Sequence, residues 1–316
     1  MRILFGDGPK EVAVGTKMIH GWIVEADRRE GILGSPACSS RPVGSPSNST
    51  PARIRIGVAL GGGFARGIAH AGVLKVLQQF SLPIHCITGV SAGAIVAAAY
   101  ASGASPDEIA RIGCSMRFSD VARWSPRLLG LVGSDRMNRF LRRILKTHRF
   151  EEMTIPLGVV ATDLATGQPV PFSGTGEVFE AIRASCSYPG LFRPVRRGGK
   201  LLVDGAMSME IPAELCRQLG ATHVISVRLP ARATGAQPSN MLEVIHRCLQ
   251  ILQSTSDHGW RHETDLVIAP EVGAIEWNGF RRSRELVVAG EAAALRAIPK
   301  IQEWFTCNWS GALAAA

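Results

Sequence analysis

Short apolar runs alternate with helical patterns along most of the chain from residue 53 onward. Runs of about four to eight apolar residues are typical of buried strands, whereas apolar residues spaced three and four apart are typical of helices. The predicted strands cover residues 54–60, 84–88, 157–164, 200–204, 223–229 and 265–270. The predicted helices cover residues 67–80, 176–186, 212–219, 241–256 and 283–298. A further helix is predicted within residues 89–103, where Gly103 ends it. This alternation predicts a three-layer α/β/α fold, with helices on both faces of a mostly parallel sheet.

The first 52 residues do not share this pattern. Residues 34–52 are rich in Pro, Gly and Ser, a composition too polar and too interrupted to build a core. We therefore predict an N-terminal extension with a linker over 1–52, one domain over 53–306 and a C-terminal tail over 307–316. The opening segment has no uninterrupted apolar run, so it does not match a secretory signal. Seven cysteines without a CxxC pair predict a reduced, cytoplasmic protein with no zinc site.

A long stretch without formal charge, residues 76–106, is compatible in length with a membrane span. Pro83, His85 and Gly89 interrupt its apolar character. A buried strand followed by a helix of small residues explains this stretch better than a span does.

The composition excludes a disordered chain, because 46% of the 316 residues are hydrophobic and only 19% are charged. The formal net charge of +9 favours anionic partners, such as nucleic acid or phospholipid headgroups. Nucleic acid is not expected, since no zinc finger, ribonucleoprotein motif or aromatic interleaving accompanies the charge. Residues 134–150 combine an apolar stripe with Arg and Lys, which fits either peripheral contact with a membrane or a surface helix packed on the core.

The sharpest chemical signal is Gly89-Val90-Ser91-Ala92-Gly93, a G-x-S-x-G pattern between a predicted strand and a predicted helix. A serine on such a tight turn can present its hydroxyl as a nucleophile, and the flanking Gly89 and Gly93 permit a strained backbone and close approach of neighbouring chains. A serine that only caps the helix is the alternative. The placement between strand and helix favours the nucleophile.

A second glycine-rich loop, GGGFARG over residues 61–67, also lies between a strand and a helix. Its N–H groups could bind a phosphate or the oxyanion of a tetrahedral intermediate. The glycines do not fit the spacing of a dinucleotide-binding loop, and no Gly-Lys-Ser/Thr sequence follows to make a Walker loop. Together with Ser91, the loop predicts acyl transfer, with donors in one loop and a nucleophile in the other.

A serine nucleophile needs a base, and Asp204 is the strongest candidate. It ends the predicted strand 200–204 and precedes Gly205, which permits close approach. Ligands collect at the C-terminal ends of strands in open α/β sheets, although an Asp at this place could also only cap a turn. A Ser-Asp-His triad remains a second possibility, because four histidines follow in the chain: His223, His246, His258 and His262.

Five ordered stretches resemble the patatin-like phospholipases: LGGGFARGIAHAGVL (60–74), GVSAGA (89–94), ATDLATG (161–167), ASCSYPGLFRPV (184–195) and VDGA (203–206). The resemblance implies a patatin-like fold, hydrolysis of fatty-acyl esters of lipids, and no metal or other cofactor. It also implies a Ser-Asp dyad, and it assigns the roles to named residues. These are Ser91 as nucleophile, Asp204 as proton acceptor in a DGA motif with Gly205 and Ala206, and an oxyanion loop of Gly61, Gly62 and Gly63.

Two positions depart from the family pattern. Phe64 stands where close relatives often have a fourth glycine, and Met209-Glu210 lies where an Asn-Asn-like pair often follows the DGA motif. Because loss of one oxyanion donor costs about 3 kcal/mol in the barrier, Phe64 keeps open a non-catalytic lipid-binding or regulatory protein. A Ser-Asp-His esterase for small esters is the other alternative.

Overall fold

The computed structural model of the chain describes residues 53–127, 129–133, 135–230, 237–255 and 259–313. The predicted extension and linker, residues 1–52, lie outside this part. The described chain is a mixed α/β structure around one large sheet, as the sequence predicts.

A central sheet of eight strands organises the fold. Its strands are β1 (Ile56–Leu60), β2 (Ile84–Val90), β5 (Leu157–Asp163), β6 (Pro169–Ser173), β7 (Val195–Arg197), β8 (Lys200–Asp204), β9 (His223–Val227) and β10 (Leu266–Ile268). They follow the order β10-β9-β1-β2-β5-β8-β7, with β6 also paired to β5. Neighbours from β10 to β5 run parallel, whereas β6, β7 and β8 pair antiparallel. The sheet is therefore mostly parallel, with an antiparallel side.

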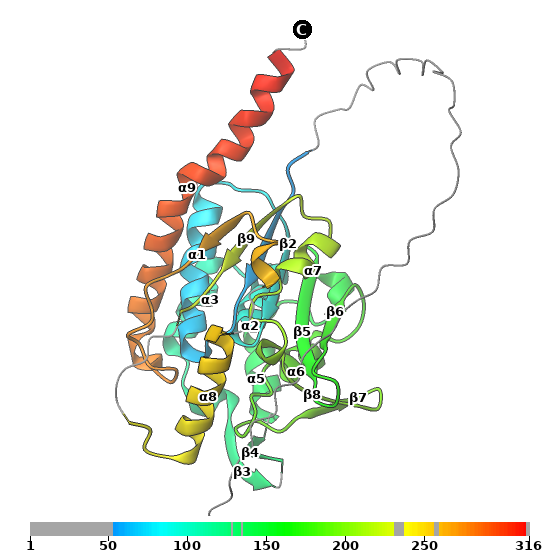
Figure 1. Ribbon diagram of the computed structural model, residues 1–316, viewed down its shortest axis with the longest axis vertical. Helices are drawn as coiled ribbons and strands as arrows, with labels where there is room; N and C mark the ends of the chain where they lie inside the picture. The colour runs from blue at the N-terminus through cyan, green and yellow to red at the C-terminus, as the bar shows by residue number, and fades with distance from the viewer. Residues whose placement is uncertain (1–52, 128, 134, 231–236, 256–258, 314–316) are drawn as a thin grey trace, which may run out of the picture. The chain divides into compact units, whose positions relative to one another are not determined.

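Helices lie on both sides of the strands, as Figure 1 shows for α1 (Ala69–Gln79) and α9 (Ser283–Leu313) on one side and α7 (Ala213–Gln218) on the other. The side chains of β1 alternate between two apolar clusters. Val58 belongs to the main core, whereas Ala59 belongs to a smaller cluster with Cys216 of α7. The remaining helices are α2 (Ala92–Ala101), α3 (Pro106–Ser115), α4 (Phe118–Val121), α5 (Asp135–Ile144), α6 (Val178–Ser185) and α8 (Met241–Thr255).

The uncharged stretch forms β2 and α2 inside the core, as predicted, and both elements are almost entirely buried. No helix within the described ranges has the length and apolar character needed to cross a bilayer.

The basic segment 134–150 forms a helix, α5, only as far as Ile144. Its apolar stripe is buried in the main core: Met137, Phe140, Leu141, Ile144 and Leu145 are all at most 5% exposed. The structure therefore supports a surface helix packed on the core, with its basic side chains on the outer face.

Several elements differ from the prediction, and α3, α4, β6 and β7 have no counterpart in it. The apolar pattern predicts that the last helix ends at residue 298, yet α9 continues through Pro299 to Leu313. Ile298 and Ile301, on either side of Pro299, are buried in the core. The free energy of this burial compensates for the backbone hydrogen bond that the proline cannot donate. The short hairpin of β3 (Arg123–Arg127) and β4 (Gly130–Gly133) carries no clear alternation and is not predicted.

Candidate active site

Two strands meet end to end along one edge of β5, and the site forms where they meet. β2 pairs with β5 as far as Val90, which lies opposite Val160. From the next residue of β5, Ala161, the same edge pairs with Asp204, the last residue of β8, because β6 occupies the other edge. Ser91 directly follows β2 and so lies beside Asp204. Asp204 does end its strand, but β8 is antiparallel to β5, so the C-terminal ends of β2 and β8 face each other.

Ser91 sits on a sharp turn between β2 and α2. Its φ of 55° lies in the left-handed region, which costs a residue other than glycine about 1–3 kcal/mol. The flanking chains approach closely: a Cβ on Gly89 would lie 2.5 Å from the carbonyl oxygen of Gly93, and a Cβ on Gly93 would lie 2.4 Å from that of Leu60. Only glycine fits at both positions, so the turn depends on the two glycines of the G-x-S-x-G pattern.

The hydroxyl of Ser91 donates a hydrogen bond of 2.7 Å to Oδ2 of Asp204. The other carboxylate oxygen accepts a hydrogen bond of 2.9 Å from the backbone N–H of Ala206. Asp204 is 1% exposed, and this burial raises the pKa of its carboxyl to about 7, although both hydrogen bonds oppose the shift. A carboxyl with a pKa near 7 can accept a proton and return it at neutral pH.

Side chains from two further stretches hold the backbone of this pair. Thr162 of β5 donates a hydrogen bond of 2.9 Å to the carbonyl oxygen of Asp204. The end of α6 fixes Ser91: the hydroxyl of Ser185 accepts from its N–H at 2.9 Å, and the thiol of Cys186 donates to its carbonyl oxygen at 3.3 Å. These contacts give a physical role to the ATDLATG and ASCSYPG stretches.

The glycine loop lies against Ser91, since a Cβ on Gly62 would be 3.3 Å from the Cβ of Ser91. Gly61 already donates its N–H to the carbonyl oxygen of Val227 at 3.0 Å. No described residue accepts a hydrogen bond from the N–H groups of Gly62 and Gly63. Gly61 thus ties the loop to the end of β9, and within the described residues Gly62 and Gly63 have the available donors.

A buried histidine holds the same loop from the side of α1. Nε2 of His70 donates a hydrogen bond of 2.8 Å to the carbonyl oxygen of Gly61. Burial lowers the pKa of this histidine to about 4, so its ring is neutral at pH 7. Its place in the core fits an anchor for the loop.

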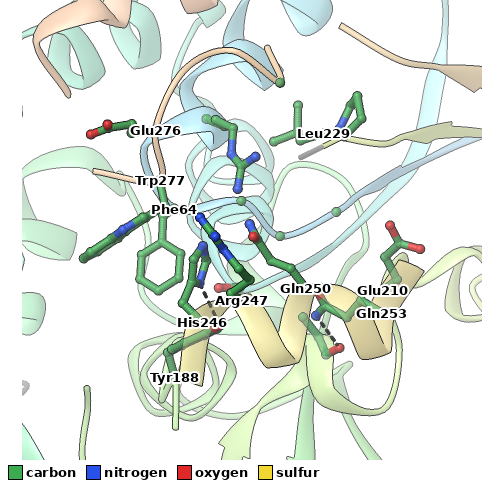
Figure 2. Close-up of a pocket in the computed structure, with 18 of the residues that line it drawn as sticks. Phe64, Tyr188, Glu210, Leu229, His246, Arg247, Gln250, Gln253, Glu276 and Trp277 are labelled. Atoms are coloured by element: carbon green, nitrogen blue, oxygen red, sulfur yellow. Dashed lines mark hydrogen bonds between the residues drawn. The ribbon is translucent and has the colours of Figure 1, made fainter. Parts of the chain in front are cut away.

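Phe64 adopts a φ of 50°, the conformation in which a glycine would be unstrained. Its ring packs edge-on against Tyr188 at 4.8 Å between centroids and against Trp277 at 5.1 Å, with the ring of His246 at 5.9 Å (Figure 2). These four rings come from four separate segments of the chain. The aromatic contacts offset the strain of the backbone at Phe64.

Two hollows share Ser91 and Phe64 among their lining residues. The first is a polar pocket of about 340 Å³, into which Arg247 and Gln250 reach from α8 (Figure 2). The second is an apolar cavity of about 90 Å³ between α2, α3 and α5, lined by residues such as Ile95, Ile109 and Phe140. Ser91 therefore lines both a polar pocket and an apolar cavity.

The histidines do not complete a triad within the described residues. His246 lines the polar pocket, but its Nδ1 bonds the hydroxyl of Tyr188 at 2.9 Å (Figure 2), while Ser91 donates to Asp204. Chiefly through burial, the pKa of His246 falls to about 4. Of the other three candidates, His223 opens β9, His262 is exposed, and His258 lies outside the described residues. Across the described ranges, no three His, Cys, Asp or Glu side chains gather as a metal site.

Several residues of the polar pocket carry no signal that the sequence reasoning used. Gln253 of α8 donates to the carbonyl oxygen of Ala206 at 3.0 Å (Figure 2), and Arg247 lines the same pocket. The pattern of α8 is only a partial guide, because Leu242 packs against the core while Met241 and Val244 are exposed and a polar face lines the site. Arg66 lies within GGGFARG, where its charge could have been noticed.

Known proteins resemble this chain over the part that contains the glycine loop, Ser91 and Asp204. The family model of patatin-like phospholipases matches residues 58–217. An uncharacterized NTE family protein of Mycobacterium tuberculosis is 33% identical over 209 residues, which cover 64% of this chain and 57% of that protein. The human patatin-like phospholipase domain-containing protein 6 is 29% identical over 180 residues, which cover 54% of this chain and 13% of that protein.

Among solved structures, VipD from Legionella pneumophila aligns with a TM-score of 0.48 and 13% identity, over 78% of this chain and 67% of that one.

The chain spans little more than half the length of the Mycobacterium tuberculosis relative and a small part of the human one. The family model covers about half of the chain and includes both the glycine loop and the residues on each side of Ser91 and Asp204. The chain belongs to the patatin-like phospholipase family.

Proposed function

We propose that this chain is a serine acyl hydrolase that cleaves fatty-acyl esters of lipids with Ser91 as nucleophile and Asp204 as base. The observation that supports it most is the 2.7 Å hydrogen bond from the Ser91 hydroxyl to a carboxyl closed off from water. Membership of the patatin-like phospholipase family supports lipid hydrolysis at the level of the family.

In the proposed first half-reaction, Oγ of Ser91 forms a bond to the ester carbonyl carbon while its proton passes to Oδ2 of Asp204. The N–H groups of Gly62 and Gly63 donate hydrogen bonds to the oxyanion that develops. The intermediate then collapses, the bond to the leaving alcohol breaks, and Asp204 returns the proton to that alcohol oxygen.

Water completes the cycle on the acyl-serine. Asp204 takes a proton from the water, whose oxygen adds to the acyl carbonyl carbon. The bond to Oγ breaks as the second intermediate collapses, and Asp204 returns the proton to Ser91. The fatty acid leaves, and the dyad is regenerated without metal or cofactor.

The two hollows suggest how a lipid ester would lie relative to Ser91. The apolar cavity beside Ser91 suits the start of an acyl chain, and the polar pocket suits the alcohol part of the ester. Lipid esters combine both characters, whereas small soluble esters need no apolar cavity.

We also propose that the chain meets its substrate at a membrane surface. Its cytoplasmic location remains a prediction. Exposed Arg139, Arg142 and Arg143 of α5 can attract anionic headgroups. The buried stripe of α5 is not available to enter a bilayer. Replacing all three arginines with glutamine should reduce co-sedimentation with anionic vesicles and leave neutral vesicles unaffected; unchanged co-sedimentation would remove α5 from the proposal.

Labelling with a fluorophosphonate probe tests the nucleophile. The full chain should be modified covalently, Ser91→Ala should abolish the label, and Ser115→Ala, at an exposed serine outside both hollows, should retain it. A folded wild type that is not labelled would instead favour the non-catalytic lipid-binding protein.

Hydrolysis rates on esters of increasing acyl-chain length, measured below and above the micellar concentration, distinguish the proposed lipid hydrolase from a Ser-Asp-His esterase for small esters. The proposed lipid hydrolase should prefer longer chains, and His246→Ala should cost far less activity than Asp204→Asn. Equal losses in both variants with a preference for short monomeric esters would establish the Ser-Asp-His esterase.

A further inference from the structure

The outer face of α8 is apolar. Within the described part of this helix, the exposed residues are Met241, Val244, Cys248, Ile251 and Leu252. They are spaced three, four, three and one residues apart, so they form one stripe along the helix, the α8 stripe. Met241 is 69% exposed and Leu252 is 60% exposed. Because a surface helix ordinarily presents polar residues to water, the α8 stripe indicates a surface that binds another apolar surface.

The other two faces of α8 are engaged within the chain. On one of them, Ile245 lies over the loop that follows α6, since a Cβ on Gly190 would be 3.5 Å from its side chain. The polar face lines the pocket, where His246 bonds the hydroxyl of Tyr188 at 2.9 Å (Figure 2). From the same face, Gln253 donates a hydrogen bond of 3.0 Å to the backbone of the DGA motif. These contacts fix the helix with the α8 stripe toward solvent.

The α8 stripe extends to the polar pocket. Ile251 is 55% exposed and is also one of the residues that line this pocket. Ser91 lines the same pocket. A surface that covers the α8 stripe therefore adjoins the pocket of the proposed nucleophile.

The segments next to α8 are positively charged. The loop beneath its first half belongs to residues 186–203, and this segment is joined to the β3–β4 hairpin, residues 123–133, by a hydrogen bond of 2.9 Å from the N–H of Val132 to the carbonyl oxygen of Leu191. The two segments contain six Arg or Lys residues and neither Asp nor Glu. Arg123 and Arg196 among them are exposed. Cations beside an apolar stripe complement an anionic lipid surface, where negative headgroups cover apolar acyl chains.

We propose that the α8 stripe docks on the surface of an anionic bilayer, with its apolar side chains among the acyl chains and the neighbouring cations at the headgroups. A helix with one apolar face lies in the plane of such an interface. The net charge of +9 attracts an anionic surface and repels a second copy of the chain. The choice of lipid as the partner rests on the proposed hydrolase, and the docking residues belong to a different helix from the arginines of α5.

An environment-sensitive fluorophore on Cys248 tests the contact directly. The chain used carries Ser91→Ala, so that it does not hydrolyse the vesicles, together with Cys38→Ser, Cys114→Ser and Cys307→Ser. Within the described residues, this leaves Cys248 as the exposed cysteine. Vesicles of phosphatidylglycerol and phosphatidylcholine in equal parts should shift its emission to shorter wavelength and raise the intensity, because the fluorophore leaves water.

Cys114 gives the matched control, since it is an exposed cysteine of α3. In a chain that keeps Cys114 and carries Cys248→Ser instead, the same vesicles should leave the emission unchanged. Equal shifts at the two positions, or no shift at Cys248, would overturn the proposal.

A second measurement replaces part of the α8 stripe. Val244→Gln combined with Leu252→Gln should lower co-sedimentation with the same vesicles about tenfold, since two apolar side chains no longer enter the acyl layer. Val288→Gln combined with Leu295→Gln removes two similarly exposed apolar side chains from α9 and should leave co-sedimentation unchanged. Both double variants should melt like the parent chain, because none of the four side chains is buried. Equal binding by the two variants would refute the docking site.

A second copy of the chain is the other occupant that these experiments detect. It would shift the emission of the Cys248 fluorophore without vesicles as protein concentration rises, and light scattering would show a dimer that Val244→Gln with Leu252→Gln abolishes. That result would overturn the lipid assignment. Vesicle binding is measured on the Ser91→Ala chain and does not depend on catalysis. A wild-type chain that the fluorophosphonate labels, but whose Ser91→Ala form does not bind vesicles, would refute the docking surface alone.

Discussion

The carboxyl of Asp204 is almost entirely buried, so replacing Asp204 with asparagine should change how protein stability depends on pH. Burial raises its pKa from an ordinary value of 3.8 to about 7. The unfolded chain therefore releases this proton above a pH of about 4, while the folded chain keeps it until about 7. Because the folded state binds the extra proton, its stability falls as pH rises through this window.

The size of the effect follows from the shift. A shift of about 3 pK units at about 1.4 kcal/mol each makes the folded chain about 4 kcal/mol less stable above the window than below it. Asparagine has no proton to lose, and its side-chain oxygen can still accept from the N–H of Ala206. The free energy of unfolding of Asp204→Asn, relative to wild type, should rise by about 2.5 kcal/mol between pH 5 and pH 8.

Urea unfolding of both proteins at a series of pH values measures this difference directly. Ser91→Ala is the matched control: it should also be inactive, yet it keeps the carboxyl and loses only a hydrogen bond that opposes the shift, so stability should fall with pH at least as much as in the wild type. A relative stability of Asp204→Asn that does not change between pH 5 and pH 8 would show that Asp204 is not a carboxyl of raised pKa, and it would refute the reasoning.

Four further predictions concern activity and the extent of the domain. Because only ionised Asp204 can accept the proton of Ser91, kcat/KM should fall about tenfold per pH unit below an apparent pKa near 7; a limb near 4 would contradict this. Gly93→Ala should abolish labelling and lower the melting temperature, because its Cβ would overlap backbone, whereas Gly259→Ala, which meets open space, should do neither. Phe64→Gly should remove the ring between the polar pocket and the apolar cavity and shift preference toward longer chains; an unchanged chain-length profile would exclude that role. Finally, a chain that starts at residue 53 should melt and label like the full chain; loss of folding would place part of the domain before that residue.

The sequence was sufficient for the buried strands and for the sharp turn that carries Ser91, because their signals are local. A strand such as Leu157–Asp163 is a continuous apolar run, and the turn at Ser91 depends on glycines two residues away on either side. Asp204 could also be found, since it ends an apolar strand before a glycine.

What the sequence could not supply are relations between distant segments. The antiparallel direction of β8 is decided by pairing to β5 and not by any residue of β8 itself. The engagement of the Gly61 N–H with Val227 depends on β9, over 160 residues later. Likewise, α8 leaves Met241 and Val244 exposed while His246 and Gln250 line the pocket, an arrangement that its apolar positions alone do not predict.

The single edge of β5 that receives both β2 and β8 links catalysis to the order of folding. Val160 holds the end of one strand and Ala161 the end of the other, so Ser91 and Asp204 are joined only once both pairings exist. Backbone hydrogen exchange on β8 and recovery of hydrolysis during refolding should therefore follow one time course. The proposed dyad therefore forms only in the step that pairs β8 with β5, and a chain with β8 unpaired would lack the dyad even if the rest of the sheet were folded.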